Sequence, residues 1–185
     1  MLLRELKVNN IGPFHGEQTV AFASDPEHPV TLIGGKNGSG KTTLLESILV
    51  ALYGSRSRGL LGFTNYPEFL REVTHDSSSN GSISLVFDRR EDGKDRRYTL
   101  VRRWKTPLID PPKEIFTVTV DGEERTDLVA SWPEYVEQIL PESMAGLSIF
   151  DGERLEALAD SATSTEALRA SLYGLLGLDL VQRLQ

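Results

Sequence analysis

The sequence predicts an α/β fold, on three observations. A glycine-rich loop at residues 35–42 joins a short apolar run to a segment with helical periodicity. Residues 82–120 then change to the period of two that is typical of strands. The chain has 185 residues, of which 39% are hydrophobic, enough to bury a core. We expect a mixed sheet around one central helix, with an antiparallel β subdomain at 82–121.

The glycine-rich loop matches the pattern G-x-x-x-x-G-K-[ST] of a phosphate-binding P-loop. Residues 29–33 before it predict a buried strand, and residues 41–53 after it predict a helix with apolar positions 44, 45, 48, 49 and 52. Glycines allow backbone N–H groups to turn toward phosphate oxygens. Lys41 would reach the β- and γ-phosphates, and the Thr42 hydroxyl would bind Mg²⁺. We therefore expect a nucleoside triphosphate to bind here.

The first strands of the chain are expected at residues 2–8 and 17–23, joined by the turn-rich segment 9–16. A hairpin ahead of the P-loop strand is unlike the simplest P-loop enzymes and favours the ABC and SMC-like ATPase branch. In that branch the hairpin lies beside the nucleotide base, which would place Phe14 near adenine. The alternative for Phe14 is a turn aromatic that packs against the protein.

The middle of the chain is expected to hold a loop region and then a β meander. Residues 55–81 are rich in Gly, Ser, Asn and Pro, and within them only 68–73 suggests a helix. Strands are expected at 82–88, 97–104 and 115–120, the last ending in the turn Asp121-Gly122.

The meander carries the chain's strongest local charge. The whole chain has a net charge of −7, which argues against indiscriminate binding of nucleic acid. Residues 89–105 nevertheless hold eight basic and three acidic residues, a local charge of 8 − 3 = +5. A basic sheet face can grip a phosphate backbone, whereas the alternative is a solvated hairpin whose arginines pair with local acids. The candidate DNA contacts are Arg89, Arg90, Arg96, Arg97, Arg102, Arg103 and Lys105.

The last part of the chain predicts helices. A helix is expected at 127–140, interrupted at Trp132-Pro133 so that Pro133 falls in a first turn with Ser131 as its cap, and an amphipathic helix at 161–185 would begin a coiled-coil arm. Between them an apolar run ends in Asp151-Gly152-Glu153. The expected divisions are 1–54 (P-loop core), 55–81 (loops), 82–121 (β subdomain), 122–160 (return to the core) and 161–185 (arm).

Two parts of a complete ATPase site are missing from the sequence. No apolar run ends in the Asp-Glu pair of a Walker B strand, and no Leu-Ser-Gly-Gly signature loop occurs. Leu85-Val86-Phe87-Asp88-Arg89 comes near, but it has a basic residue where the catalytic acid belongs. Either the rest of the site lies in sequence outside this chain, or the chain is a self-contained NTPase or kinase in which Asp151 or Glu153 serves as Walker B. For these two acids a plain solvated turn is a further alternative.

Several other classes of protein are disfavoured by composition. The chain has no cysteine, and its three histidines lack metal-binding spacing. No apolar run approaches the ~20 residues of a membrane span, and the N-terminus opens into a strand pattern instead of a signal peptide. We expect a cytoplasmic protein that has no membrane partner.

The chain resembles the N-terminal head half of an SMC-like ATPase of the SbcC and RecN kind. The resemblance is carried by the opening strand and Gly-Pro-aromatic turn at 7–14, and by the P-loop and helix at 32–48. Residues 34–38 and Phe150-Asp151-Gly152-Glu153 resemble DndD, the ATPase of the DNA phosphorothioation system. A related DNA-repair or anti-phage defence ATPase is the alternative within the superfamily.

The resemblance implies ATP and Mg²⁺ as cofactors and assigns roles to individual residues. Asn37, Gly38, Gly40 and Lys41 would hold the phosphates and Thr42 the Mg²⁺. Asp151 falls where relatives carry a Q-loop glutamine, with Glu153 beside it. The catalytic candidates are thus Lys41, Asp151 and Glu153; the Mg²⁺ ligands are Thr42 and Asp151; the nucleotide site comprises Gly35, Lys36, Asn37, Gly38, Ser39, Gly40, Lys41, Thr42 and Thr43.

The same resemblance implies partners. They are the C-terminal half of the same head, a second head that joins on ATP binding to form a homodimer, double-stranded DNA, and other proteins of the DNA modification system.

Overall fold

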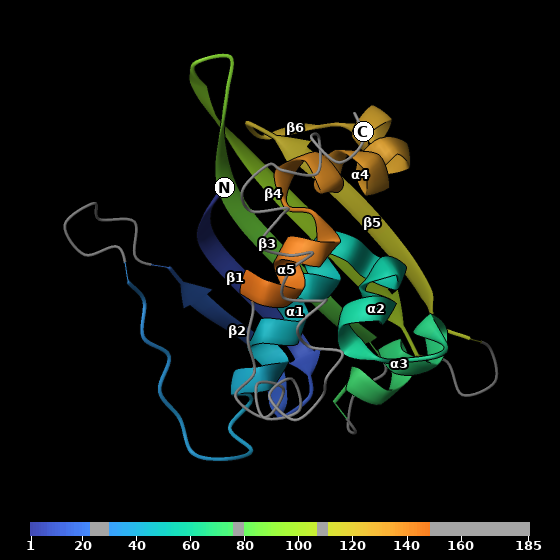
Figure 1. The fold of residues 1–185 in the computed structure, drawn as a ribbon. Coiled ribbons are helices and arrows are strands. Elements are labelled where there is room, and N and C mark those ends of the chain that lie inside the picture. The colour runs from blue at the N-terminus through green and yellow to red at the C-terminus, as the bar shows by residue number, and fades with distance from the viewer. Residues whose placement is uncertain (23–29, 76–79, 107–110, 149–185) are drawn as a thin grey trace, which may run out of the picture. The chain divides into compact units, whose positions relative to one another are not determined.

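The computed structural model describes residues 1–22, 30–75, 80–106 and 111–148. The chain divides into two compact units, residues 1–135 and 136–185. The first unit contains the P-loop and the whole sheet (Figure 1).

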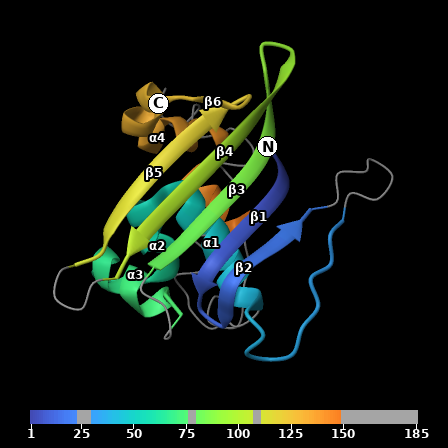
Figure 2. The same ribbon diagram turned by 180° about the vertical axis from the view of Figure 1, so that it is seen from behind.

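One antiparallel sheet of six strands forms the first unit, in the order β2-β1-β3-β4-β5-β6 (Figure 2). The meander expected at 82–121 shares this sheet with the N-terminal hairpin, because β1 pairs with β3 from Leu2↔Asp88 to Asn9↔Ser82. Every strand pair in the described residues is antiparallel, so the expected mixed sheet is not seen there. The strands are β1 (Leu2–Ile11), β2 (Phe14–Ala21), β3 (Asn80–Glu91), β4 (Lys94–Lys105), β5 (Lys113–Val120) and β6 (Glu123–Glu124).

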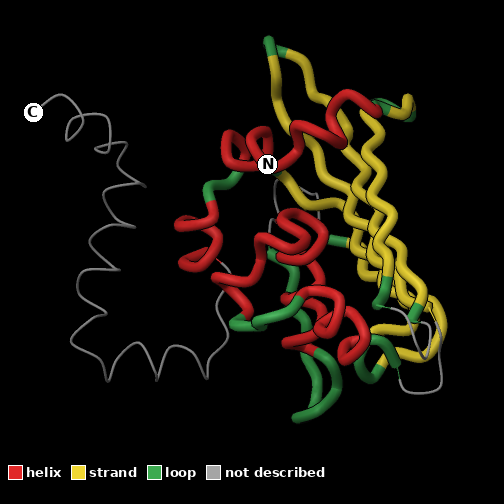
Figure 3. Tube along the Cα trace, turned by 90° about the vertical axis from the view of Figure 1, so that its right-hand side faces the viewer, coloured by secondary structure: helices red, strands yellow, loops and turns green. Residues whose placement is uncertain are grey.

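The two faces of the sheet differ, and the sequence alternation explains why. Side chains at alternate positions of β3 and β4, such as Leu85 and Leu100, are fully buried, and their strand neighbours are half-buried or exposed. Helices α1 (Lys41–Tyr53), α2 (Arg58–Leu61) and α3 (Tyr66–Val73) lie on the buried face, and the view from behind shows the other face uncovered (Figures 1 and 2). Figure 3 shows the strands of the sheet in yellow from the side.

Helix α1 forms the centre of the core. It begins after Gly40 and ends at Gly54, as the sequence predicts. Ile48, Leu49 and Leu52 are buried, which confirms most of the expected apolar face. Ala51 and Tyr53 are buried as well, so the second half of the helix is enclosed on all sides.

The expected strand at residues 29–33 is wrong for the part that the structure describes. Residues 30–36 are irregular, and Val30 and Leu32 are 81% and 92% exposed. A β-branched run becomes a buried strand only where neighbouring strands pair with it and a core covers it. No strand of the described residues pairs with this segment.

The region expected to be loops apart from a helix at 68–73, residues 55–81, is largely helical where it is described, and α3 confirms that helix. It contains the 3₁₀ turn η1 (Gly54–Ser57), then α2 and α3. Gly62 ends α2 at a φ of 78°, and the side chain of Asn65 accepts a hydrogen bond from the Glu68 N–H at the start of α3. Turn-forming residues therefore act here as helix caps.

Helix α4 (Thr126–Ile139) is continuous through Trp132 and Pro133, so the interruption expected there is wrong and Pro133 lies inside the helix and not in its first turn. Ser131 does not cap the helix; its hydroxyl donates to the Asp127 carbonyl at 3.2 Å. Helix α5 (Glu142–Ser148) follows in the second unit. Among the described residues, no helix has the length and apolar character that crossing a membrane requires.

Candidate nucleotide site and basic surface

The P-loop conformation depends on its glycines. Gly38 and Gly40 have φ of 77° and 94°, in the left-handed region that favours glycine. A Cβ on Gly40 would collide with the ring of Phe14, and one on Gly35 would collide with Ser39. The glycines at 35, 38 and 40 thus occupy positions that a larger residue would strain or obstruct.

The β1–β2 turn packs against this loop. A Cβ on Gly12 would lie 2.9 Å from Thr43 Cγ2, and the Gly12 N–H donates to the Val73 carbonyl at 2.7 Å. Phe14 is half-buried against Gly40, which is the packing role left open for it. Its contact with a base stays a prediction.

The chemistry of the loop suits a polyphosphate. Lys41 Nζ donates to the carbonyls of Gly35 and Lys36, both at 2.9 Å, so the ammonium is held over the loop. Lys36, Asn37 and Ser39 are exposed, and helix α1 has no acid in its first turn to oppose an anion at its positive end.

Only part of a magnesium site can be located. Thr42 lies in the first turn of α1 and is exposed. No cluster of three or more His, Cys, Asp or Glu that could hold a metal occurs in the described residues. Asp151 and Glu153, expected to supply carboxylates, lie outside those residues, as does the helix expected at 161–185.

Asp88, the acid of the Walker B-like run, is engaged elsewhere. It accepts from Arg97 Nε at 2.8 Å and from Arg4 Nε at 2.6 Å. The hydrogen bond from Arg97 is the main reason that the pKa of Asp88 is lowered. Leu85 and Phe87 are buried on the face of β3 that the helices cover. Because side chains alternate along a strand, Asp88 lies on the opposite face, away from α1. Asp88 therefore does not serve the nucleotide site.

Arg102 was expected to contact DNA from an exposed position, and this prediction is wrong because the side chain is buried. Its side chain is 7% exposed because its strand register points it toward the helices. The guanidinium donates to the Ala51 carbonyl at 3.1 Å and to Glu114 at 2.9 Å, and lies 3.8 Å from the centre of the Phe116 ring. Arg102 thus holds the C-terminal end of α1, where a cation complements the helix dipole.

Three other candidate DNA contacts are neutralised near the β3–β4 turn. Arg89 pairs with Glu91 at 2.9 Å, Arg96 with Asp121 at 2.7 Å and Arg97 with Asp88 at 2.8 Å. These are the local acids that the solvated-hairpin alternative invoked.

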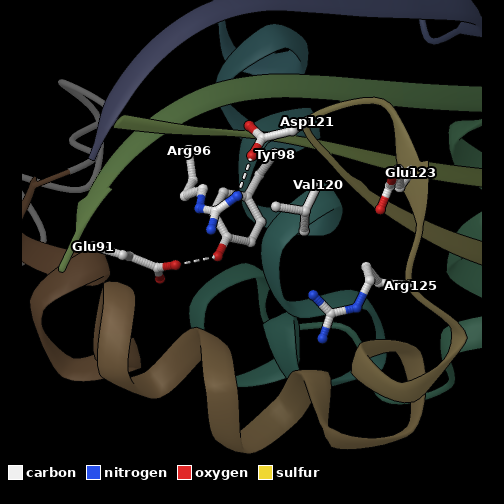
Figure 4. A pocket seen from close by; sticks show the side chains of 7 residues that line it. All are labelled: Glu91, Arg96, Tyr98, Val120, Asp121, Glu123 and Arg125. Carbon is white, nitrogen blue, oxygen red and sulfur yellow. Dashed lines mark hydrogen bonds and ion pairs between the residues drawn. The ribbon is translucent and has the colours of Figure 1, made fainter. Parts of the chain in front are cut away.

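A polar pocket of about 280 Å³ lies at this end of the sheet (Figure 4). Burial raises the pKa of Tyr98, whose hydroxyl donates to Glu91 at 2.8 Å. Burial would raise the pKa of Glu91 too, but hydrogen bonds from Tyr135 and Tyr98 outweigh it and lower that pKa. Both arginines of the pocket are paired with acids, so it offers no surplus positive charge. Its lining residues are Glu91, Arg96, Tyr98, Val120, Asp121, Glu123 and Arg125.

Arg90 is exposed near the β3–β4 turn and forms no ion pair within the described residues. Arg103 and Lys105 likewise differ from the three paired arginines. Both are exposed at the other end of β4, and within the described chain neither forms an ion pair. Lys113 lies directly opposite Lys105 on β5. Sequence reasoning missed Lys113 because it lies outside the basic run, and only the strand register brings it there.

Comparisons with known proteins agree with this architecture. The AAA domain family matches residues 5–160. The DNA double-strand break repair Rad50 ATPase of Archaeoglobus fulgidus is 32% identical over 136 residues, which cover 72% of this chain and 12% of the relative. The SbcC component of the nuclease SbcCD from Staphylococcus aureus is 42% identical over 141 residues, covering 73% of this chain and 13% of the relative.

The chain therefore spans about an eighth of the length of these curated relatives. The family match covers most of the chain and includes the P-loop, the hairpin that packs on it and the sheet. The chain belongs to the AAA domain family and is similar to the SMC-like ATPase heads of Rad50 and SbcC.

Proposed function

We propose that this chain is the ATP-binding N-terminal half of an SMC-like ATPase head that couples ATP binding and hydrolysis to DNA engagement. The observation that carries the proposal is the P-loop itself, a glycine-rich loop braced by the β1–β2 turn with Lys41 held over it. ATP phosphates would accept from the loop N–H groups, and Lys41 would exchange its two carbonyl partners for the β- and γ-phosphates. Thr42 would hold Mg²⁺, which supplies charge neutralisation at the phosphates when it is bound.

The exposed segment 30–33 supports the idea of a half-site. It places an apolar β-branched run in solvent directly before the P-loop. A strand from the C-terminal half of the same head would cover these side chains and pair their backbone, at a gain of about 25 cal/mol per Å² of apolar surface. A Walker B carboxylate could arrive with that strand. The rival is a self-contained NTPase that uses Asp151 or Glu153.

DNA would be engaged by the exposed cations of the sheet. Arg103 and Lys105 retain their charge for a phosphate backbone, whereas Arg89, Arg96 and Arg97 near the β3–β4 turn are paired. In such heads two copies close on ATP, and closure is passed to the bound DNA.

For the pathway we propose DNA phosphorothioation, on the resemblance of residues 34–38 and 150–153 to DndD. Break repair is the second candidate, favoured by the names of the Rad50 and SbcCD relatives. Deleting the gene separates them. Loss of iodine-cleavable phosphorothioate linkages supports the first, whereas intact linkages with greater sensitivity to strand breaks contradict it and favour the second.

Nucleotide binding is tested with the variant Lys41→Ala. A fluorescent ATP analogue should bind the chain with Mg²⁺, and Lys41→Ala should abolish that binding with no change in the circular dichroism spectrum. Lys94→Ala is the control: it removes an exposed lysine at the β3–β4 turn, outside the P-loop, and should leave the affinity unchanged. Unchanged affinity in Lys41→Ala would remove the basis of the proposal.

A further inference from the structure

A second and larger hollow, of about 970 Å³, lies at the end of the sheet opposite the β3–β4 turn. The beginnings of β3 and β5 and the end of β4 form it. Its cations are Arg103, Lys105 and Lys113. We call it the basic groove.

Charge in the basic groove is not balanced by the protein. Lys105 and Lys113 are directly opposite in the β4–β5 register, where like charges destabilise a sheet. Neither lysine, nor Arg103, has an ion-pair partner in the part of the chain that the structure describes. Glu114 also lines the groove, but its two carboxylate oxygens accept from Tyr66 at 2.6 Å and from Arg102 at 2.9 Å. An anion that enters the groove would relieve the repulsion.

The spacing of the cations suits a chain of phosphates. Arg103 and Lys105 lie two residues apart on the same face of β4, a separation of about 6.8 Å at the rise of an antiparallel strand. Adjacent phosphates of an extended nucleic-acid strand are separated by a comparable distance. Asn9, Asn80 and Ser82 add amide and hydroxyl groups at the other side of the groove.

The basic groove also has apolar walls, which a phosphate alone does not require. Trp104 packs over Gly81, where a Cβ would lie 2.7 Å from the indole. Trp104 is 3% exposed and donates its indole N–H to Thr74 Oγ1 at 2.9 Å, so it lies on the helix-covered face of the sheet behind the groove. Ile115 is 65% exposed on the same face as Arg103, its partner in the strand register, and it forms the apolar wall of the groove together with Pro111.

A mixed basic and apolar groove distinguishes between forms of nucleic acid. A duplex turns its phosphates outward and keeps its bases stacked inside, so it offers nothing to an apolar hollow. A single strand offers phosphates and the faces of unstacked bases together.

We infer that the basic groove binds a single-stranded nucleic-acid segment, with phosphates on Arg103, Lys105 and Lys113 and a base against Ile115 and Pro111. The inference rests on the proposed DNA engagement and adds which form of the nucleic acid this end of the sheet takes.

The test is the anisotropy of a fluorescent oligothymidylate of about 12 nucleotides, titrated with the 185-residue chain at several salt concentrations. The double variant Lys105→Gln/Lys113→Gln should weaken binding at least tenfold and reduce the log–log salt slope by about 1.4, at about 0.7 per phosphate contact. Lys94→Gln/Arg96→Gln is the matched control, because it removes two charges at the opposite end of the same strand. It should change affinity less than twofold.

The variant Ile115→Ala tests the apolar wall, because it leaves every charge in place. It should weaken binding of the oligothymidylate about threefold and leave a duplex of equal length unaffected. Circular dichroism and ATP-analogue binding report that each variant is folded.

The outcomes separate this inference from the proposed function. Duplex binding that equals or exceeds single-strand binding, or equal losses in the two double variants, overturns the basic groove and leaves DNA engagement standing. Displacement of the oligothymidylate by polyglutamate at equal charge concentration overturns it in favour of an acidic peptide. Absence of binding to either form of DNA removes the proposed DNA engagement itself.

Discussion

Replacing Arg102 by Met should destabilise the first unit far more than its place in a basic strand suggests. The substitution keeps the apolar volume that packs on Phe116 but removes the bonds to Ala51 and Glu114. Removing one partner of a buried ion pair costs about 3–5 kcal/mol. Glu114 is 18% exposed and keeps its bond to Tyr66, so we expect a value near the lower end, about 3 kcal/mol.

The assay is urea unfolding followed by tryptophan fluorescence, since Trp104 and Trp132 are both buried in this unit. Arg103→Met is the matched control: it removes the same charged group one residue away, at an exposed position, and should cost less than ~0.5 kcal/mol. The double variant Arg102→Met/Glu114→Gln should be more stable than Arg102→Met, because it leaves no unpaired charge. A loss below ~1 kcal/mol in Arg102→Met would refute the reasoning.

The remaining predictions concern the site and the sheet. Gly40→Ala should lower the melting temperature and weaken ATP-analogue binding, because it strains a left-handed position and collides with Phe14; Gly16→Ala, at a φ of 71° with open space around it, controls for backbone strain alone. Asp88 should make the free energy of unfolding depend on pH in the acidic range. Its folded pKa lies below its unfolded value, so its contribution is complete above the unfolded pKa of about 3.9 and is lost as pH falls through the folded pKa. Unfolding midpoints of Asp88→Asn should therefore fall less steeply than wild type below that value, and an unchanged acid slope would contradict the role of the Arg97 and Arg4 bonds.

Local patterns in the sequence located most elements of the first unit. The alternation in β3 and β4, the apolar face of α1 and the Asp121-Gly122 turn were all expected, because each depends on residues close together in the chain. The helical turns at 54–61 were missed because their Gly and Ser residues favour loops in composition, whereas α3 contains the helix expected at 68–73. The strand expected at 29–33 failed because burial depends on a neighbour that local sequence does not contain.

The candidate site likewise has a part that local sequence predicts and a part that depends on residues far apart in the chain. The P-loop follows from a contiguous motif, so its residues could be named from the sequence, and their contact with a nucleotide stays a prediction. Which arginines are available could not be predicted, because Arg96 meets Asp121 and Arg97 meets Asp88 through strand pairing, and Arg102 turns inward by its register. Lys113 joins Lys105 for the same reason.

The half-site is tested most directly by steady-state ATP hydrolysis of the 185-residue chain with Mg²⁺ over a range of protein concentrations. ATP binding is followed in parallel, with Lys41→Ala as the control. We predict binding without turnover at every concentration, because the carboxylate that activates water would come from the other half of the head. Turnover that disappears in Lys41→Ala would contradict the half-site and direct mutagenesis to Asp151 and Glu153.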